Sequence, residues 1–249
     1  MNQRPNVVAL VIAWAVLTAA GVALALSVGL FPSPASKEAR IIDGAMTLLT
    51  VLAVPIFAMV VVLLLYSALR FRQRGEPAED GPPIRGNLKL ELTWVLVTLV
   101  LVLVLAWYGT AGLLEIRHHT AEAAEGQLVV QVHSSQWSWE YTYPAYGIRT
   151  KEELRLPVGR PVRFEITAAD VIHSFWVPAF RTKIDAVPGM TTVVYATPDR
   201  VGSFQEDYHF RVQCAELCGL GHGVMVTPVV VVEPSQFEAW AAQQSGRTR

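Results

Sequence analysis

Three long apolar stretches, separated by short polar segments, occupy the first 114 residues of the chain. They cover residues 7–31, 45–69 and 92–114, and none of the three contains a charged residue. A helix needs about 20 mostly apolar residues to cross a bilayer. The pattern therefore predicts three transmembrane helices, which together make residues 1–114 a membrane anchor.

The basic residues of the loops predict the orientation of this anchor. The loop after the second stretch has five of them, whereas the loop after the first has only Lys37 and Arg40. Cytoplasmic loops are the ones enriched in Lys and Arg. We therefore expect everything after the third helix to lie on the outer face. Separately, we expect the membrane that holds this integral protein to be that of a bacterial cell. The five basic residues are Arg70, Arg72, Arg74, Arg85 and Lys89.

The first apolar stretch has a second interpretation, as a cleaved signal peptide. The apolar part of a signal peptide is usually about 7–15 residues long and is followed by a small-residue cleavage site. Residues 7–31 are longer than that, and no clear A-x-A site follows them. These features favour a retained helix.

The hydrophobic period changes from helical to alternating after residue 126. Short runs rich in β-branched residues cover 127–133, 160–167, 191–196 and 226–233, with Pro and Gly between them. Such runs are typical of strands, and many short strands without a long helix predict a sandwich or a small barrel. We expect this external domain to cover residues 115–249 and to end in a short helix that begins near Ser235.

Composition excludes several classes of protein. Hydrophobic residues make up 52% of the chain and charged residues 16%, which excludes a disordered chain and does not suit an ordinary soluble domain. Twenty basic residues balance 21 acidic ones, so no basic excess points to nucleic acid. Two cysteines exclude a disulfide scaffold.

One segment concentrates soft metal ligands. It reads CAELCGLGHGVM and contains Cys214, Cys218, His222 and Met225. Thiolate, thioether and imidazole ligands together select copper, and two thiolates on one loop can each bridge two metal ions. A disulfide between the cysteines would explain neither the histidine nor the methionine, and zinc rarely recruits methionine. A second histidine is then needed, and His173 supplies it from upstream.

At this point the chain resembles subunit II of the haem–copper cytochrome c oxidases. The pattern C-x-E-x-C-G-x-x-H-x-x-M is complete at 214–225, and D-V-x-H-S-F, Q-W-S-W-E and K-I-D-A-V-P-G stand at 170–175, 136–140 and 183–189. The resemblance implies transmembrane α-helices followed by an all-β cupredoxin domain, a Greek-key β-sandwich, that holds the dinuclear copper centre CuA. It implies that Cys214 and Cys218 bridge the coppers, that His173 and His222 are terminal ligands, and that Met225 and the backbone carbonyl of Glu216 are weak axial ligands.

The same resemblance implies roles for three further side chains. Trp137 would be the point where electrons enter from cytochrome c; its alternative is one aromatic face of a sheet packed on the core. The Glu216 carboxylate would help hold Mg²⁺ at the boundary with subunit I. Glu91 would stand at the mouth of a proton-uptake path into subunit I, and its alternative is an interfacial glutamate that reaches toward water.

The implied function is that of the electron-accepting subunit of a terminal respiratory oxidase, a proton-translocating complex. Electrons would come from cytochrome c or an equivalent small carrier and pass to haem in subunit I, where oxygen is reduced to water; subunit III and others are further implied partners. The chain contains no C-x-x-C-H, so the haem belongs to its partners only. A CuA-bearing subunit of a nitric oxide reductase and a membrane-tethered copper-binding protein are the alternatives. Glu140, Glu206 and Asp207 would either steer a basic donor or be ordinary surface carboxylates.

Overall fold

The computed structural model describes residues 6–72, 75, 83, 85–122 and 126–247. The chain divides into two compact units. One contains Met1–Leu30 and Gly44–Ala111, and the other contains Phe31–Asp43 and Gly112–Arg249. Arg74 of the predicted cytoplasmic loop lies outside the described residues. The domain division expected after residue 114 stays a prediction.

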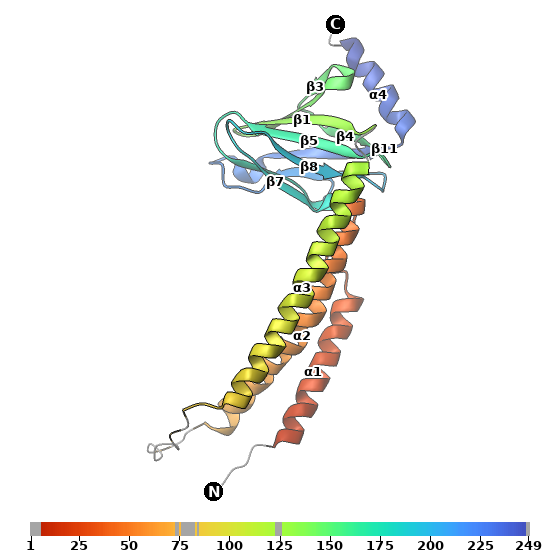
Figure 1. The fold of residues 1–249 in the computed structure, drawn as a ribbon. Coiled ribbons are helices and arrows are strands. Elements are labelled where there is room, and N and C mark those ends of the chain that lie inside the picture. Colours follow the sequence, from red (N-terminus) through yellow and green to blue (C-terminus); the bar gives the residue numbers. More distant parts are fainter. Residues whose placement is uncertain (1–5, 73–74, 76–82, 84, 123–125, 248–249) are drawn as a thin grey trace. The chain divides into compact units, whose positions relative to one another are not determined.

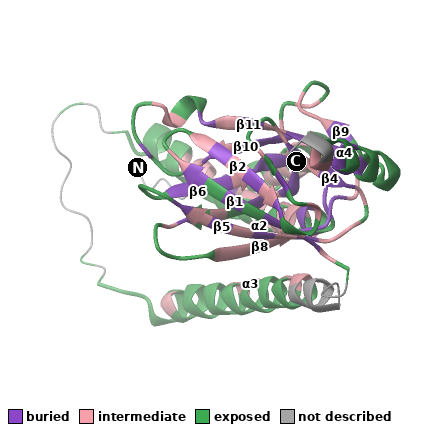
Figure 2. Ribbon diagram, turned by 90° about the horizontal axis from the view of Figure 1, so that it is seen from above, coloured by how far each residue is buried: buried purple, intermediate pink, exposed green. Residues whose placement is uncertain are grey.

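Three apolar helices precede the strands, as the hydrophobic pattern predicts. They are α1 (Val7–Ser27), α2 (Lys37–Arg70) and α3 (Leu88–Glu122), and each is long and apolar enough to cross a membrane. Most residues of α3 between positions 88 and 116 are exposed, as the colour of the α3 ribbon in Figure 2 shows. The first helix ends at Ser27 because Val28 is extended and Pro32 and Pro34 follow, a sequence that does not continue a helix.

Helices α1 and α2 pack through specific contacts. A Cβ placed on Gly21 would lie 2.8 Å from Cγ1 of Val54, so only glycine allows this approach. The Trp14 indole N–H donates to the Pro55 carbonyl at 2.8 Å. Small residues at close helix contacts and polar groups paired across helices are the usual basis of helix association in lipid.

The rest of the described chain is a β-sandwich, as expected. One sheet has the strand order β3-β2-β1-β5-β8, and the other has the order β4-β11-β10-β6-β7, with β9 beside β11. The β1–β5 and β4–β11 pairs are parallel, and the other pairs are antiparallel. Figure 1 shows the two layers, with the C-terminal helix α4 (Pro234–Arg247) beside β3. The strands are β1 (Leu128–Ser135), β2 (Ser138–Tyr143), β3 (Ile148–Thr150), β4 (Leu154–Pro157), β5 (Val162–Ala168), β6 (His173–Val177), β7 (Thr182–Ala186), β8 (Thr192–Ala196), β9 (Gly202–Ser203), β10 (Arg211–Cys214) and β11 (Val226–Val232).

The core lies between the two sheets. Alternate residues of β1, β2 and β5 face it, and their burial follows the strand period of two. Aromatic rings fill its centre: Trp139, Phe164 and Phe175 are fully buried, and Trp139 meets Phe175 edge to face. This packing fixes the strand ends that carry the site described below.

Residues 31–43 belong to the β-unit, although they precede α3 by many residues. Ala35 and Ser36 are fully buried, and Ser36 bridges to Pro198. The Ala35 N–H donates to the Ala179 carbonyl at 2.9 Å. The Arg181 guanidinium donates two hydrogen bonds, of 2.7 and 2.8 Å, to the Asp43 carboxylate. We call residues 31–43 the strap; it is tied to the β-sandwich by both backbone and side-chain bonds.

Candidate metal centre

Three loops meet at the end of the β-sandwich. The longest connects β10 to β11 and contains the short 3₁₀ turn His222–Val224. The second precedes β6, and the third connects β1 to β2. Cys214 is the last residue of β10 and His173 the first of β6, two strands that pair antiparallel. The sheet therefore brings together two predicted ligands that are 41 residues apart in the chain.

The predicted sulfur and imidazole ligands form one cluster. Cys214 Sγ and Cys218 Sγ lie 3.6 Å apart. His173 Nδ1 lies 3.8 Å from Cys214 Sγ, and His222 Nδ1 lies 3.7 Å from Cys218 Sγ. The two sulfurs thus stand between two imidazoles, each of which turns its Nδ1 toward the pair.

The two weaker predicted ligands flank this cluster. Met225 is fully buried, with Sδ 3.9 Å from Cys218 Sγ. The Glu216 carbonyl oxygen lies 3.2 Å from Cys214 Sγ, while the Glu216 residue as a whole is exposed. The backbone oxygen of Glu216 therefore lies beside a sulfur of the cluster, although the residue is exposed to solvent.

The cluster is shielded from water and carries free thiols. His173, Cys214 and Cys218 expose 0%, 2% and 3% of their surface. The sulfur–sulfur distance of 3.6 Å is far longer than the roughly 2.05 Å of a disulfide, and both cysteines are free. Burial and the neighbouring Cys214 together raise the pKa of the Cys218 thiol to about 11. Without a nearby cation, the Cys218 thiol stays protonated at neutral pH.

This donor set fits copper. Two thiols, two imidazoles and a thioether are soft or intermediate ligands, and a buried, closed site of this kind excludes the water that hard cations retain. The ligand atoms of His173, Cys214 and Cys218 all lie within 4.8 Å of one another. A cation that pairs with both sulfurs would offset the cost of deprotonating them in a buried site.

Asp170 was not singled out by the sequence reasoning, although it stands three residues before His173 in the quoted motif. Its Oδ1 lies 2.9 Å from His173 Nε2 and accepts from the Val171 N–H at 2.7 Å. Its Oδ2 accepts from the Gln136 N–H at 2.7 Å. Burial raises the pKa of Asp170, but these hydrogen bonds outweigh it and hold the pKa below its usual range.

Trp137 lies against the metal loop. Its indole N–H donates to the Cys218 carbonyl at 3.2 Å, and the Gln136 side-chain amide donates to the same oxygen at 2.8 Å. Trp137 is 41% exposed, whereas the next aromatic residue, Trp139, is buried in the core. The aromatic run of β2 therefore packs on the core as the simpler interpretation expects, but Trp137 itself stands outside it.

The other candidate carboxylates have partners of their own. Glu91 accepts from the Asn87 N–H at 3.1 Å in the first turn of α3, while Asn87 Oδ1 accepts from the Leu90 N–H. This reciprocal pattern caps the helix. Glu140 bonds Arg149 at 2.5 Å, and Asp207 pairs with Arg200 and His209. Glu140 and Asp207 are thus partly neutralised by cations of the same chain, which weakens their predicted steering role.

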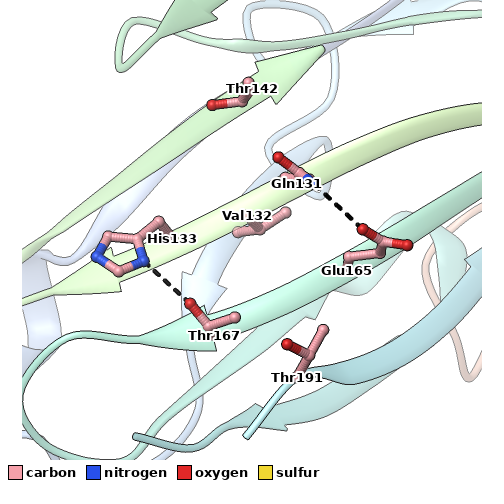
Figure 3. Close-up of a pocket in the computed structure, with 7 residues that line it drawn as sticks. All are labelled: Gln131, Val132, His133, Thr142, Glu165, Thr167 and Thr191. Atoms are coloured by element: carbon pink, nitrogen blue, oxygen red, sulfur yellow. Dashed lines mark hydrogen bonds between the residues drawn. The ribbon is translucent and has the colours of Figure 1, made fainter. Parts of the chain in front are cut away.

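Apart from this cluster, a pocket of about 270 Å³ lies on the outer face of the β3-β2-β1-β5-β8 sheet (Figure 3). Four of its polar side chains form two hydrogen-bonded pairs. His133 Nδ1 lies 3.0 Å from Thr167 Oγ1, and the Gln131 amide donates to Glu165 at 3.3 Å (Figure 3). No thiol lines it. The cluster of sulfurs and imidazoles is therefore the better candidate for chemistry.

Comparison with known proteins gives consistent matches. The family model described as cytochrome C oxidase subunit II, transmembrane domain, matches residues 23–110, and that of the periplasmic domain of the same subunit matches residues 147–233. Cytochrome c oxidase subunit 2 from a Synechocystis species is 32% identical in an alignment of 257 positions, gaps included, that covers 86% of this chain and 75% of that protein. The protein of the same name from Thermostichus vulcanus is 33% identical and covers 86% and 78%.

One solved structure among the matches is the periplasmic domain of subunit II of the cytochrome oxidase of Bradyrhizobium japonicum. It is 30% identical, covers 50% of this chain and 98% of its own, and aligns with a TM-score of 0.46.

Proposed function

Because the chain belongs to the cytochrome c oxidase subunit II family, we propose that it is the electron-accepting subunit of a terminal respiratory oxidase. It would accept electrons from cytochrome c, or an equivalent carrier, at a dinuclear copper centre and pass them to haem in subunit I, where oxygen is reduced to water. The family is that of a membrane protein with an outer β-domain. The membrane we propose is that of a bacterial cell.

The observation that carries this proposal is the arrangement of two buried sulfurs between two imidazoles. Separations of 3.6 to 3.8 Å leave each sulfur near its own histidine and near the other sulfur. Two copper ions bridged by Cys214 and Cys218 would use every one of these donors. His173 and His222 would then be terminal ligands, with Met225 and the Glu216 carbonyl as axial ligands.

The residues around the cluster support an electron relay rather than a substrate site. Bound in this way, a copper pair supplies one-electron transfer with little change of geometry. The chain contributes rigidity, because the strand ends of β6 and β10 hold two ligands and the core packs behind them. It also excludes water, because the cysteines and His173 are buried. No hydrogen-bonded path to a substrate is needed for such a relay.

Three further roles belong to the same proposal. Trp137 is exposed and bonded to the carbonyl of Cys218, which supports it as the residue through which electrons arrive. The exposed Glu216 carboxylate is available for Mg²⁺ at a boundary with subunit I. Glu91 caps α3 and would also stand at the mouth of a proton path. Subunit I and further subunits of the oxidase are the proposed partners.

Copper stoichiometry and electron paramagnetic resonance on the full-length chain in detergent test the proposal. We expect two coppers per chain and one unpaired electron with hyperfine structure from both nuclei. The Cys218→Ser variant is expected to lose this signal. One exchangeable copper with a single-nucleus pattern would instead favour a membrane-tethered copper-binding protein and would overturn the proposal.

A further inference from the structure

Asp170 is the one carboxylate that contacts a residue of the metal cluster through its side chain among the described residues. Two backbone hydrogen bonds fix the position of this carboxylate. Backbone N–H groups of Gln136 and Val171 each donate to it at 2.7 Å, one to each oxygen. The carboxylate therefore cannot turn away from His173 without breaking two short hydrogen bonds.

This fixed carboxylate determines the protonation of His173. A carboxylate only accepts hydrogen bonds, so the Nε2 that lies 2.9 Å from Asp170 Oδ1 must carry the proton. In the neutral imidazole the other nitrogen, Nδ1, then has a free lone pair. That nitrogen is the one that faces Cys214 Sγ at 3.8 Å. The His173 ring therefore has the orientation and the tautomer, with the proton on Nε2, that allow Nδ1 to bind a metal.

The other oxygen of Asp170 connects this histidine to the Trp137 segment. It holds the Gln136 N–H, and the Gln136 side chain in turn donates to the carbonyl of Cys218 at 2.8 Å. One carboxylate thereby links the loop of His173, the loop of Trp137 and the loop of the cysteines.

We propose that Asp170 is a positioning residue of the metal centre, which holds His173 as the Nε2–H tautomer and tunes the copper centre through that hydrogen bond. The copper measurements that test this inference rest on the proposed function, whereas the hydrogen bond between Asp170 and His173 can be tested without it. A carboxylate behind a ligating imidazole makes the ring a stronger donor and typically changes metal affinity or activity by about 10–100-fold when it is removed.

The test compares Asp170→Asn with Asp207→Asn in the full-length protein. Asp207 is a matched control, because its Oδ1 lies 2.8 Å from His209 Nδ1 outside the cluster. We expect Asp170→Asn to bind copper roughly 10–100-fold more weakly. We also expect its midpoint potential to be higher, since an anion near the oxidised centre is lost. Asp207→Asn should leave both quantities unchanged. Wild-type affinity and potential in a folded Asp170→Asn protein would overturn the inference.

A measurement on copper-free wild-type protein separates this inference from the proposed function. With ¹⁵N-labelled histidine, we expect His173 to be protonated at Nε2 and this proton to exchange slowly with solvent. An Nδ1–H tautomer or fast exchange would overturn the role of Asp170, even if the copper centre were dinuclear. Slow exchange would support it even if the wild-type chain bound a single copper, and it also decides the matter if Asp170→Asn fails to fold.

Discussion

The indole ring of Trp137 lies against the backbone of Gly221, in the loop that carries the cysteines and His222. A Cβ placed on Gly221 would come within 2.4 Å of Cδ2 of the ring. A separation this short leaves no room for any side chain, because carbon atoms in contact stay about 3.5–4.0 Å apart. The absence of a side chain at residue 221 is therefore what lets Trp137 approach the metal loop.

Gly221→Ala should displace Trp137 and slow the arrival of electrons while the copper stays bound. Displacements of about 1 Å in positioned groups can reduce rates roughly 100-fold, so we expect a decrease of about 10- to 100-fold. Stopped-flow reduction of the copper centre by cytochrome c measures this rate, and metal analysis checks the copper. Gly223→Ala is the control, since a Cβ there meets no atom within 4 Å. Equal rates in the two variants would show that Trp137 placement does not matter.

Met225→Leu should keep both coppers and raise the midpoint potential. Met225 is fully buried, and leucine has a similar volume, so the core should tolerate the change. In the proposed centre, the change would remove a weak sulfur donor, which lies 3.9 Å from Cys218 Sγ, and would make the site less able to stabilise the oxidised state. We expect a shift on the order of 60 mV, about a tenfold change for one electron.

Redox titration of Met225→Leu beside Met190→Leu measures this shift. Met190 is an exposed methionine on another loop and should leave the potential unchanged. Complete loss of copper from Met225→Leu would mean that the thioether is a structural ligand rather than a weak axial one.

Glu140→Gln should lower stability at neutral pH but not in acid. The hydrogen bond from Arg149 holds the pKa of Glu140 below its usual value, despite the opposing effect of burial. A depressed carboxyl pKa contributes stability above the unfolded pKa of about 4.3, and this contribution is lost as the pH falls through the folded pKa. The difference from wild type should be at most about 1 kcal/mol at pH 7.

Unfolding curves at pH 7 and near pH 3 check the Glu140 prediction, with exposed Glu152→Gln as the control. A difference from wild type that stays constant between the two pH values would contradict the assigned ion pair.

The sequence predicts the three helices and the β-sandwich because both depend on local periodicity. It also indicates the soft ligands of the 214–225 loop, because Cys214, Cys218, His222 and Met225 are close in the chain. The contacts of Asp170 could not be predicted in the same way. They require Gln136 and His173 to meet at the ends of different strands, which only the sheet register determines.

The burial of the strap against the β-sandwich could not be predicted from the sequence either. Residues 31–43 contain two prolines, small residues and charges, a composition typical of an exposed loop. Their burial depends on the edge formed by residues 178–181 and 197–199, far away in the chain. Arg40, one of the two basic residues between the first two apolar stretches, forms an ion pair with Asp199 of the β-unit.

The mature protein should retain the first helix. Gly21 packs on Val54, and the Trp14 indole N–H donates to a carbonyl of α2. Helix α1 is therefore held against α2 by specific contacts, as expected for a retained transmembrane helix. The intact mass of the purified protein should therefore include residues 7–27. An N-terminus after residue 28 would identify this stretch as a cleaved signal peptide.

The buried Glu38 is expected to be essential to the strap. Its two oxygens accept from the backbone N–H and the hydroxyl of Thr197 at 2.8 and 3.0 Å, and both residues are buried. Glu38→Ala leaves two buried donors without a partner, each at a cost of about 1–3 kcal/mol, so the free energy of unfolding of the β-unit should fall by at least about 2 kcal/mol. Pulse proteolysis in urea on the full-length protein measures this, with exposed Glu152→Ala as the control. Unchanged resistance in Glu38→Ala would mean that the strap rests on the sandwich without stabilising it.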